Sequence, residues 1–197
     1  MKKLLSTLHL FALLTASLAA QDAIQVDRVD FNSLRDDWIR MEVELSCLGN
    51  PSPEARNARY VEDIKVRVYL AWERDAQARL FDYYTAEVEI VIMEKGDDNN
   101  VYFYLPGLIV ERDRLRTDPD FYYVELSVND EVQVPKEQTA AMSRNIANLE
   151  ILKSFTSKAD AEGMENENFL MPIYLVSGID LGRVSDLPVF LRRDVRD

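Results

Sequence analysis

The chain has 197 residues, of which 23 are Lys or Arg and 35 are Asp or Glu, so its formal net charge at pH 7 is −12. So acidic a surface argues against polyanionic partners, such as nucleic acid or anionic lipid headgroups. Apolar residues make up 47% of the chain, which is too many for a disordered protein and predicts a folded domain.

The first 20 residues have the three parts of a bacterial secretory signal peptide. Lys2 and Lys3 give a positive start, an apolar run follows at Leu8–Leu14, and small residues end the leader. A membrane-spanning helix needs about 20 mainly apolar residues, and no stretch of the sequence is long enough. We therefore predict a signal peptide over residues 1–20. The mature chain, 21–197, is expected to be exported as a single domain without a transmembrane segment.

The mature chain lacks residue types on which much enzyme chemistry depends. His9 is the only His of the sequence, and the predicted cleavage removes it. No imidazole then remains for a catalytic triad or a metal site. Cys47 is the only Cys and alternates with apolar neighbours, so we expect a small buried residue, with an intermolecular disulfide as the alternative. We expect neither a cofactor nor a bound metal.

Strand patterns begin directly after the leader. Apolar residues alternate along Ile24–Phe31, with a break at Asp27–Arg28 that predicts a β-bulge or a change of sheet. Trp38–Leu48 alternates without a break and predicts a second strand. The residues GNPSP then indicate a loop that extends to Arg59.

The most regular part of the sequence is Tyr60–Leu105. Strict alternation of apolar and polar residues is typical of a strand with one buried face, because successive side chains point to opposite sides. It predicts strands over Tyr60–Trp72 and Tyr83–Glu94. The turn residues Lys95–Asn100 predict a hairpin that leads into a third strand at Val101–Leu105.

The second half of the chain has weaker signals. Phe121–Val128 alternates and predicts a further strand. The helical spacing of Met142, Ile146 and Leu149 predicts one short helix over Lys136–Glu150. The remaining expectations are an edge continuation at Leu108–Val110, a charged loop at Arg112–Asp120, a closing hairpin of Ile151–Thr156 and Phe169–Val176 with Pro172 at a sheet edge, and a terminal strand at Leu187–Leu191.

Short strands separated by turn signals, with almost no helix, predict an all-β fold. The alternation favours antiparallel sheets, each with one solvated face. We therefore expect an immunoglobulin-like two-sheet antiparallel β-sandwich with at most one short helix, in preference to a closed barrel.

Tyrosines are the main candidate binding residues. Alternation places Tyr102 and Tyr104 on the face opposite Phe103, so we expect them to be exposed, and Tyr123 lies in a similar strand. Exposed tyrosines suit a face that binds protein or carbohydrate. The alternative is ordinary strand composition, since Tyr favours strands.

Acidic residues give no comparable signal. Asp97–Asn100 offers oxygen ligands for Ca²⁺, but a hairpin turn requires the same residues and the spacing is not that of an EF-hand. A glycosidase needs two carboxylates at a defined separation, and among 35 acidic residues some pairs arise by chance. We expect a protein that is not an enzyme. An exported carbohydrate-active hydrolase with an Asp/Glu pair is one alternative, and a periplasmic assembly chaperone with an open edge strand is another.

Three stretches of the mature chain, VEDIKVRVYLAW at 61–72, KGDDNN at 95–100 and FYYVELSV at 121–128, carry a resemblance. With the strand order and composition, they resemble small secreted immunoglobulin-like proteins of the type IV pilus gene cluster of Akkermansia-type Verrucomicrobia. The resemblance covers most of the mature chain and implies a fold related to the outer domain of archaeal type IV pilins. It implies an adhesive or structural role and carries over no catalytic residue.

One feature departs from a true pilin: the apolar run lies in a cleavable leader without Glu, so we do not expect polymerisation through an N-terminal helix. The expected protein is a secreted or outer-surface interaction module, associated with type IV pili or adhesion. Its expected partner is a protein or glycan at the cell surface, with a homo-oligomer through exposed sandwich edges left open. The outer membrane or the medium is the expected location, and the periplasm is the alternative.

Overall fold

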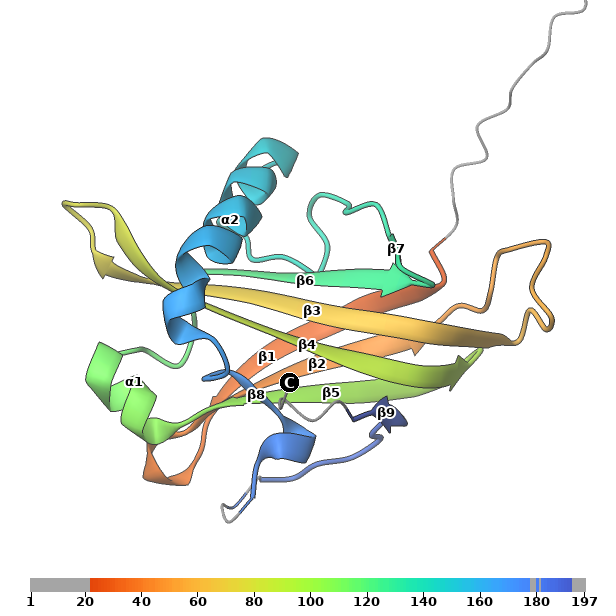
Figure 1. Ribbon diagram of the computed structural model, residues 1–197, viewed down its shortest axis with the longest axis horizontal. Coiled ribbons are helices and arrows are strands. Elements are labelled where there is room, and N and C mark those ends of the chain that lie inside the picture. The colour runs from red at the N-terminus through yellow and green to blue at the C-terminus, as the bar shows by residue number, and fades with distance from the viewer. Residues whose placement is uncertain (1–21, 178–179, 181, 193–197) are drawn as a thin grey trace, which may run out of the picture.

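The computed structural model of the chain describes residues 22–177, 180 and 182–192, so the predicted signal peptide lies outside the described residues. Within these ranges, two antiparallel sheets pack face to face, one ordered β1-β2-β5-β8 and the other β7-β6-β3-β4-β9 (Figure 1). The strands are β1 (Ile24–Ser33), β2 (Ile39–Cys47), β3 (Tyr60–Asp75), β4 (Leu80–Glu94), β5 (Asp98–Leu105), β6 (Phe121–Val128), β7 (Glu131–Val132), β8 (Met171–Pro172) and β9 (Phe190–Leu191). The helices are α1 (Gly107–Asp113) and α2 (Leu149–Glu162), with short 3-10 turns at Arg35–Asp37, Gly163–Asn166 and Ile173–Leu175.

The strand order is that of an immunoglobulin-like sandwich. In one sheet, β1, β2 and β5 take the places of strands A, B and E. In the other sheet, β7, β6, β3 and β4 take the places of G, F, C and C′. The short strands β8 and β9 extend the two sheets. The predicted all-β sandwich is therefore confirmed, with α2 as its one longer helix.

The core lies between the sheets and consists of the apolar rows that alternation predicted. The inward residues of β2 are at most 4% exposed, and those of β3 are at most 2% exposed. Cys47 is buried among them, as expected. A register shift between Val26 and Arg28 confirms the predicted bulge. Each buried aliphatic side chain contributes roughly 1.5–3 kcal/mol, so these rows supply much of the stability of the fold.

Segments from the second half of the chain close both sides of the sandwich. On the β1 side, the Oε1 atom of Gln133 accepts hydrogen bonds from the backbone N–H groups of Ala23 (2.8 Å) and Ile24 (3.2 Å). The Nε2 atom of Gln133 donates to the carbonyl oxygen of Ile24 (2.9 Å). On the opposite side, β8 pairs with β5 and β9 pairs with β4 (Figure 1).

The helix lies later in the chain than predicted, so the prediction over Lys136–Glu150 is wrong. The helix begins where Asn148 caps it: the Asn148 side chain accepts a hydrogen bond from the N–H of Ile151 (2.9 Å). The predicted closing hairpin is also wrong, because its first strand, Ile151–Thr156, lies within α2. Apolar residues in that stretch fit a short strand as well as one face of a helix, and the cap decides between the two.

Smaller predictions have mixed outcomes. Leu108–Val110 lies in α1 and does not continue β5, because Pro106 ends the strand and precedes the first helical residue. Pro172 lies in an edge strand, β8, as predicted. A terminal strand exists, but β9 is shorter than the predicted Leu187–Leu191.

The Gln133 hydrogen bonds generate a stability prediction. Gln133→Ala leaves two N–H groups and one carbonyl at the start of β1 without their partner, so we expect the free energy of unfolding to fall by about 1–3 kcal/mol. Urea denaturation of the mature chain measures the change. Gln25→Ala is the matched control, because the Gln25 side chain is exposed and donates a hydrogen bond to the nearby Asp27 side chain, and it should change stability by less than about 0.5 kcal/mol. Equal losses in both variants would contradict the assigned role of Gln133.

Candidate functional site

The tyrosine face predicted from the sequence is not exposed. Tyr102 and Tyr104 do lie on the outer side of the four-stranded sheet, but they are only 1% and 0% exposed. A later segment of the chain covers them, and Ile173 and Val184 pack against them. The backbone N–H of Ser185 also donates a hydrogen bond to the hydroxyl of Tyr102 (3.4 Å). The prediction of an exposed binding face is therefore wrong for this pair.

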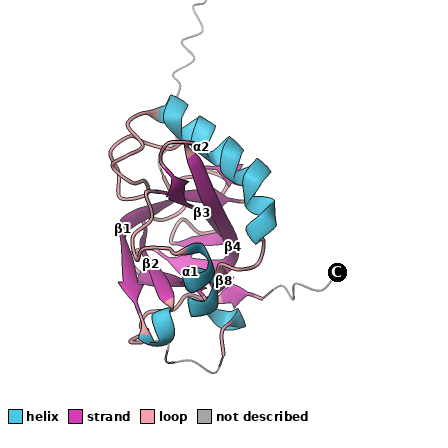
Figure 2. Cartoon of the chain, turned by 90° about the vertical axis from the view of Figure 1, so that its left-hand side faces the viewer, coloured by secondary structure: helices cyan, strands magenta, loops and turns pink. Residues whose placement is uncertain are grey.

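Tyr123 is also buried, at 4% exposure, on the outer face of the five-stranded sheet. Here the covering element is α2, which forms a third layer of the molecule (Figure 2). The helix buries Leu152, Phe155 and Ala159 against the sheet. The ring centroids of Phe155 and Tyr69 are 6.5 Å apart. Alternation identified the face correctly, but it carries no information about what covers that face.

Four aromatic rings form a closed circuit where α2 crosses the ends of β3, β4 and β6. The centroids of Phe81 and Phe121 are 5.6 Å apart, those of Phe121 and Phe155 are 5.8 Å apart, and those of Phe155 and Tyr83 are 6.3 Å apart. Phe81 and Tyr83 complete the circuit at 6.1 Å. We call these four residues the aromatic frame. Such spacings are those of favourable tilted and edge-to-face aromatic pairs.

Ala71 lies inside the aromatic frame. In the sheet register, it stands between Tyr83 on β4 and Phe121 on β6. Its side chain is a single methyl group, so it leaves space that a larger residue would fill. The result is an open hollow of about 180 Å³, which we call the aromatic hollow. The residues that line it are Ala71, Phe81, Tyr83, Phe121, Ile151, Ser154, Phe155 and Lys158.

The aromatic hollow is apolar inside and has one cation among its lining residues. Burial raises the pKa of the Tyr83 phenol, and the nearby charge of Glu162 raises it further, so Tyr83 stays neutral. Ser154 and Lys158 are exposed residues of α2. Neither side chain takes part in a hydrogen bond or ion pair within the part of the chain that the structure describes. Their polar groups are therefore free to meet a ligand.

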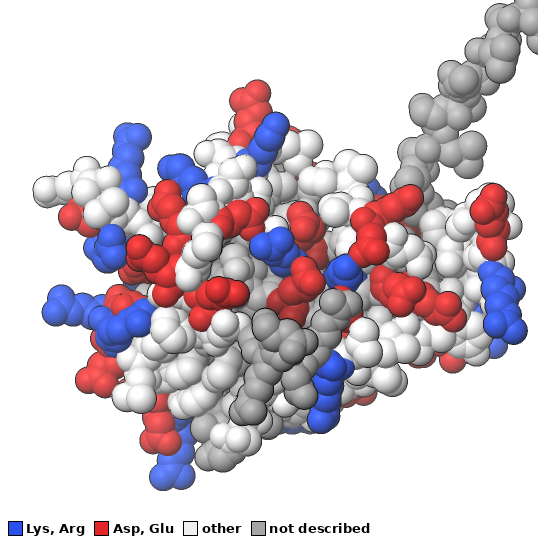
Figure 3. All heavy atoms as spheres, in the orientation of Figure 1, with Lys and Arg blue, Asp and Glu red and all other residues white. Residues whose placement is uncertain are grey.

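A second groove of about 200 Å³ lies on the other flank of α2 and includes Tyr123, Glu125 and Lys153. Burial raises the pKa of Glu125, while the neighbouring Arg67 acts to lower it. Arg67 is itself paired with Asp160 at 2.8 Å. Acidic side chains form a band across this face of the molecule, with a few Lys and Arg among them (Figure 3). Glu125 stands beside Arg67 in the sheet register, and Asp160 pairs with the same guanidinium, as in a surface ion-pair network.

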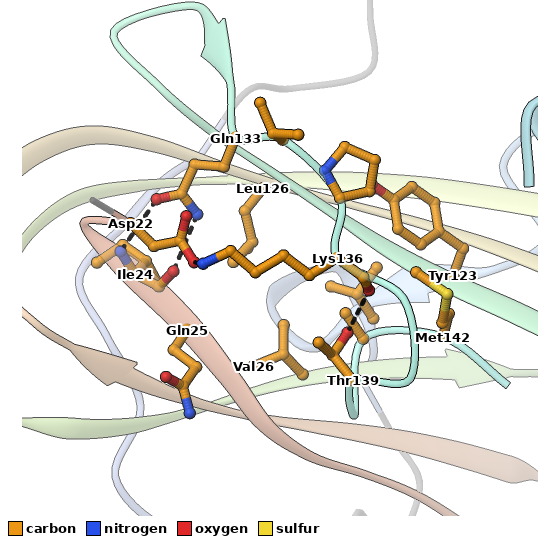
Figure 4. A pocket seen from close by; sticks show the side chains of 14 residues that line it. Asp22, Ile24, Gln25, Val26, Tyr123, Leu126, Gln133, Lys136, Thr139 and Met142 are labelled. Atoms are coloured by element: carbon orange, nitrogen blue, oxygen red, sulfur yellow. Dashed lines mark hydrogen bonds and ion pairs between the residues drawn. The ribbon is translucent and has the colours of Figure 1, made fainter. Parts of the chain in front are cut away.

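A smaller pocket of about 70 Å³ lies beside the start of β1, and its polar groups bind one another (Figure 4). Lys136 forms an ion pair with Asp22 at its margin, and Gln133 bonds to the backbone of β1.

The candidate metal ligands Asp97–Asn100 belong to the β4–β5 hairpin. In the described ranges, no three His, Cys, Asp or Glu side chains group in a way that could hold a metal ion.

The geometry defines a class: an immunoglobulin-like sandwich with a helix across one sheet and an aromatic hollow beside that helix. No protein-family model matches the chain, and no curated protein matches it by sequence. Among the solved structures that it matches is a crystal structure from Akkermansia muciniphila, with 11% sequence identity and a TM-score of 0.48. That match covers 87% of this chain and 94% of the other. Neither α1 nor α2 is a membrane-spanning helix, and the described part of the chain contains none.

The raised pKa of Glu125 generates a pH prediction. In the folded state, this carboxyl keeps its proton to a higher pH than in the unfolded chain. Below the pKa of Glu in the unfolded chain, about 4.3, the carboxyl is protonated in both states and has no effect on stability. As the pH rises through the raised pKa, the folded protein loses stability relative to a variant without the charge. We therefore expect Glu125→Gln to gain stability relative to the wild type across this range.

Urea midpoints at pH values from below to above this range measure the effect. Glu62→Gln is the matched control, because Glu62 is an exposed carboxylate on β3, five residues before Arg67. It should show a smaller dependence on pH. An advantage of Glu125→Gln that is largest at the acidic end would contradict the assignment.

Proposed function

We propose that the protein is an exported, non-catalytic interaction module of the cell surface, which binds a protein or glycan partner at the aromatic hollow. The observation that carries the proposal is the aromatic frame around Ala71. Its rings are held by a sheet and a helix, so the site is formed before a partner arrives. Preformed sites bind more tightly because little conformational freedom is lost on binding.

The surroundings of the aromatic hollow support a macromolecular partner. Exposed apolar side chains gather near the first turns of α2: Leu149 is 41% exposed and Ile151 is 39% exposed. Val132 is 54% exposed, and it lines the groove on the far flank of the helix together with Leu149. Apolar residues that line hollows on both sides of one helix are typical of a recognition surface.

The location of this activity rests on the sequence. The leader supports export, and the resemblance to proteins of type IV pilus gene clusters supports an association with pili or adhesion at the outer surface. The free edge of β1 supports self-association or an assembly-chaperone role less well. That edge bears Asp27, Arg28 and Asp30 next to the bulge, and edge charges and bulges discourage strand addition.

Two serines of α2 provide a direct test. Ser154 lines the aromatic hollow, whereas Ser157 is exposed one turn further along and lines none of the hollows described above. Ser154→Trp places an indole over the hollow, so we expect the affinity for cell-surface fractions of the source organism to fall by about tenfold or more. Ser157→Trp adds the same side chain to the same helix and should bind like the wild type.

Binding of the labelled mature chain to intact cells and to purified pili, over a concentration series, gives the affinities. Circular dichroism and urea denaturation confirm that both variants fold. Equal binding by the wild type and both variants would show that the aromatic hollow is not the recognition site. Hydrolysis of surface glycans by the wild type that Glu125→Gln abolishes would favour the hydrolase alternative.

A further inference from the structure

The aromatic hollow also limits the chemistry of what it binds, and the inference that follows rests on the proposed function. We propose that it binds one uncharged aromatic ring with an anionic group beside it. In a protein partner, these are an aromatic side chain and a neighbouring carboxylate. The ring lies within the aromatic frame, and the anion pairs with Lys158.

Size and shape favour a ring. The hollow of about 180 Å³ is close to the volume of engineered apolar cavities, about 150 Å³, that bind benzene. Its walls are four aromatic side chains already set at tilted and edge-to-face angles. A further ring can join such a group through the same geometry, in which the positive edge of one ring meets the negative face of another. A branched aliphatic chain gains no such contact.

Charge favours an anion beside the ring. Lys158 is the basic residue that lines the aromatic hollow, and its side chain forms no ion pair within the described part of the chain. Ser154, four residues earlier on α2, offers a hydroxyl donor at the same rim. A lysine and a hydroxyl side by side suit a carboxylate.

The same features argue against a cation. Cages of aromatic rings often hold quaternary ammonium groups through cation–π contacts. No carboxylate lines the aromatic hollow, whereas Lys158 does, so an incoming cation meets repulsion at the rim. Glu162, whose charge acts on Tyr83, lies one turn beyond Lys158 and is not a lining residue.

Three small probes share a phenyl ring and differ in charge: N-acetyl-phenylalanine is an anion, its amide is neutral, and phenethyltrimethylammonium is a cation. Titration of the ¹⁵N-labelled mature chain, followed by amide chemical shifts, gives the affinities. We expect the anion to bind with a Kd on the order of 1 mM. It should bind about two- to fivefold more tightly than the amide, which is the usual size of a surface charge pair. The largest shifts should fall on residues 151–158 and on Phe81 and Phe121.

Matched variants assign the effect to the rim. Lys158→Gln should remove the preference for the anion and leave binding of the amide unchanged. Lys153→Gln, on the other flank of α2, should change neither. Ser154→Trp should abolish binding of both probes, and Ser157→Trp should preserve it.

Three results would overturn the inference: tighter binding of the cation, equal binding of all three probes, or shifts that fall away from the frame. The attachment of the two serine variants to cells tests the proposed function separately. If Ser154→Trp still weakens attachment to cells while the probes fail, the hollow binds a partner of other chemistry. If both serine variants attach like the wild type, the proposed function itself fails.

Discussion

The outer face of the five-stranded sheet presents a row of tyrosine and phenylalanine rings that has to be removed from water. Each ring buries on the order of 150–250 Å² when covered, so leaving the row exposed would cost the fold several kcal/mol. The helix α2 provides the cover by placing Leu152, Phe155 and Ala159 on the sheet. Since α2 has only 14 residues, it crosses the sheet without filling its flanks. The two hollows follow from that incomplete cover.

Ala71 lines the aromatic hollow, one of the two hollows that α2 leaves on the sheet. Its neighbours across both strand pairs are aromatic, and it alone in that row has a small side chain. Ala71 is itself fully buried among these residues, and it is one of those that line the hollow. One small residue in a row of aromatic side chains therefore contributes to the shape of the aromatic hollow.

Alternation in the sequence was sufficient for the sandwich and insufficient for its outer faces. It placed the inward rows of β2 and β3 correctly, because a two-residue period records which side of a strand is apolar. It also placed Tyr102 and Tyr104 on the correct face, yet their burial depends on Ile173 and Val184, about 70 to 80 residues later in the chain. The aromatic frame had a signal, since Phe81, Tyr83 and Phe121 stand near strand ends. Its fourth ring, Phe155, falls in the predicted strand Ile151–Thr156, and it is the helix that begins at the Asn148 cap that brings this ring to the other three.

On the function proposed above, partners bind this molecule beside α2 and not at its sheet edges or at the covered tyrosines. Hydrogen–deuterium exchange of the mature chain, alone and with the purified surface component that it binds, tests this claim most directly. We expect slower exchange on binding in α2 and in the strand segments around Phe81 and Phe121. Slower exchange confined to β1, or to the segment that covers Tyr102 and Tyr104, would contradict it.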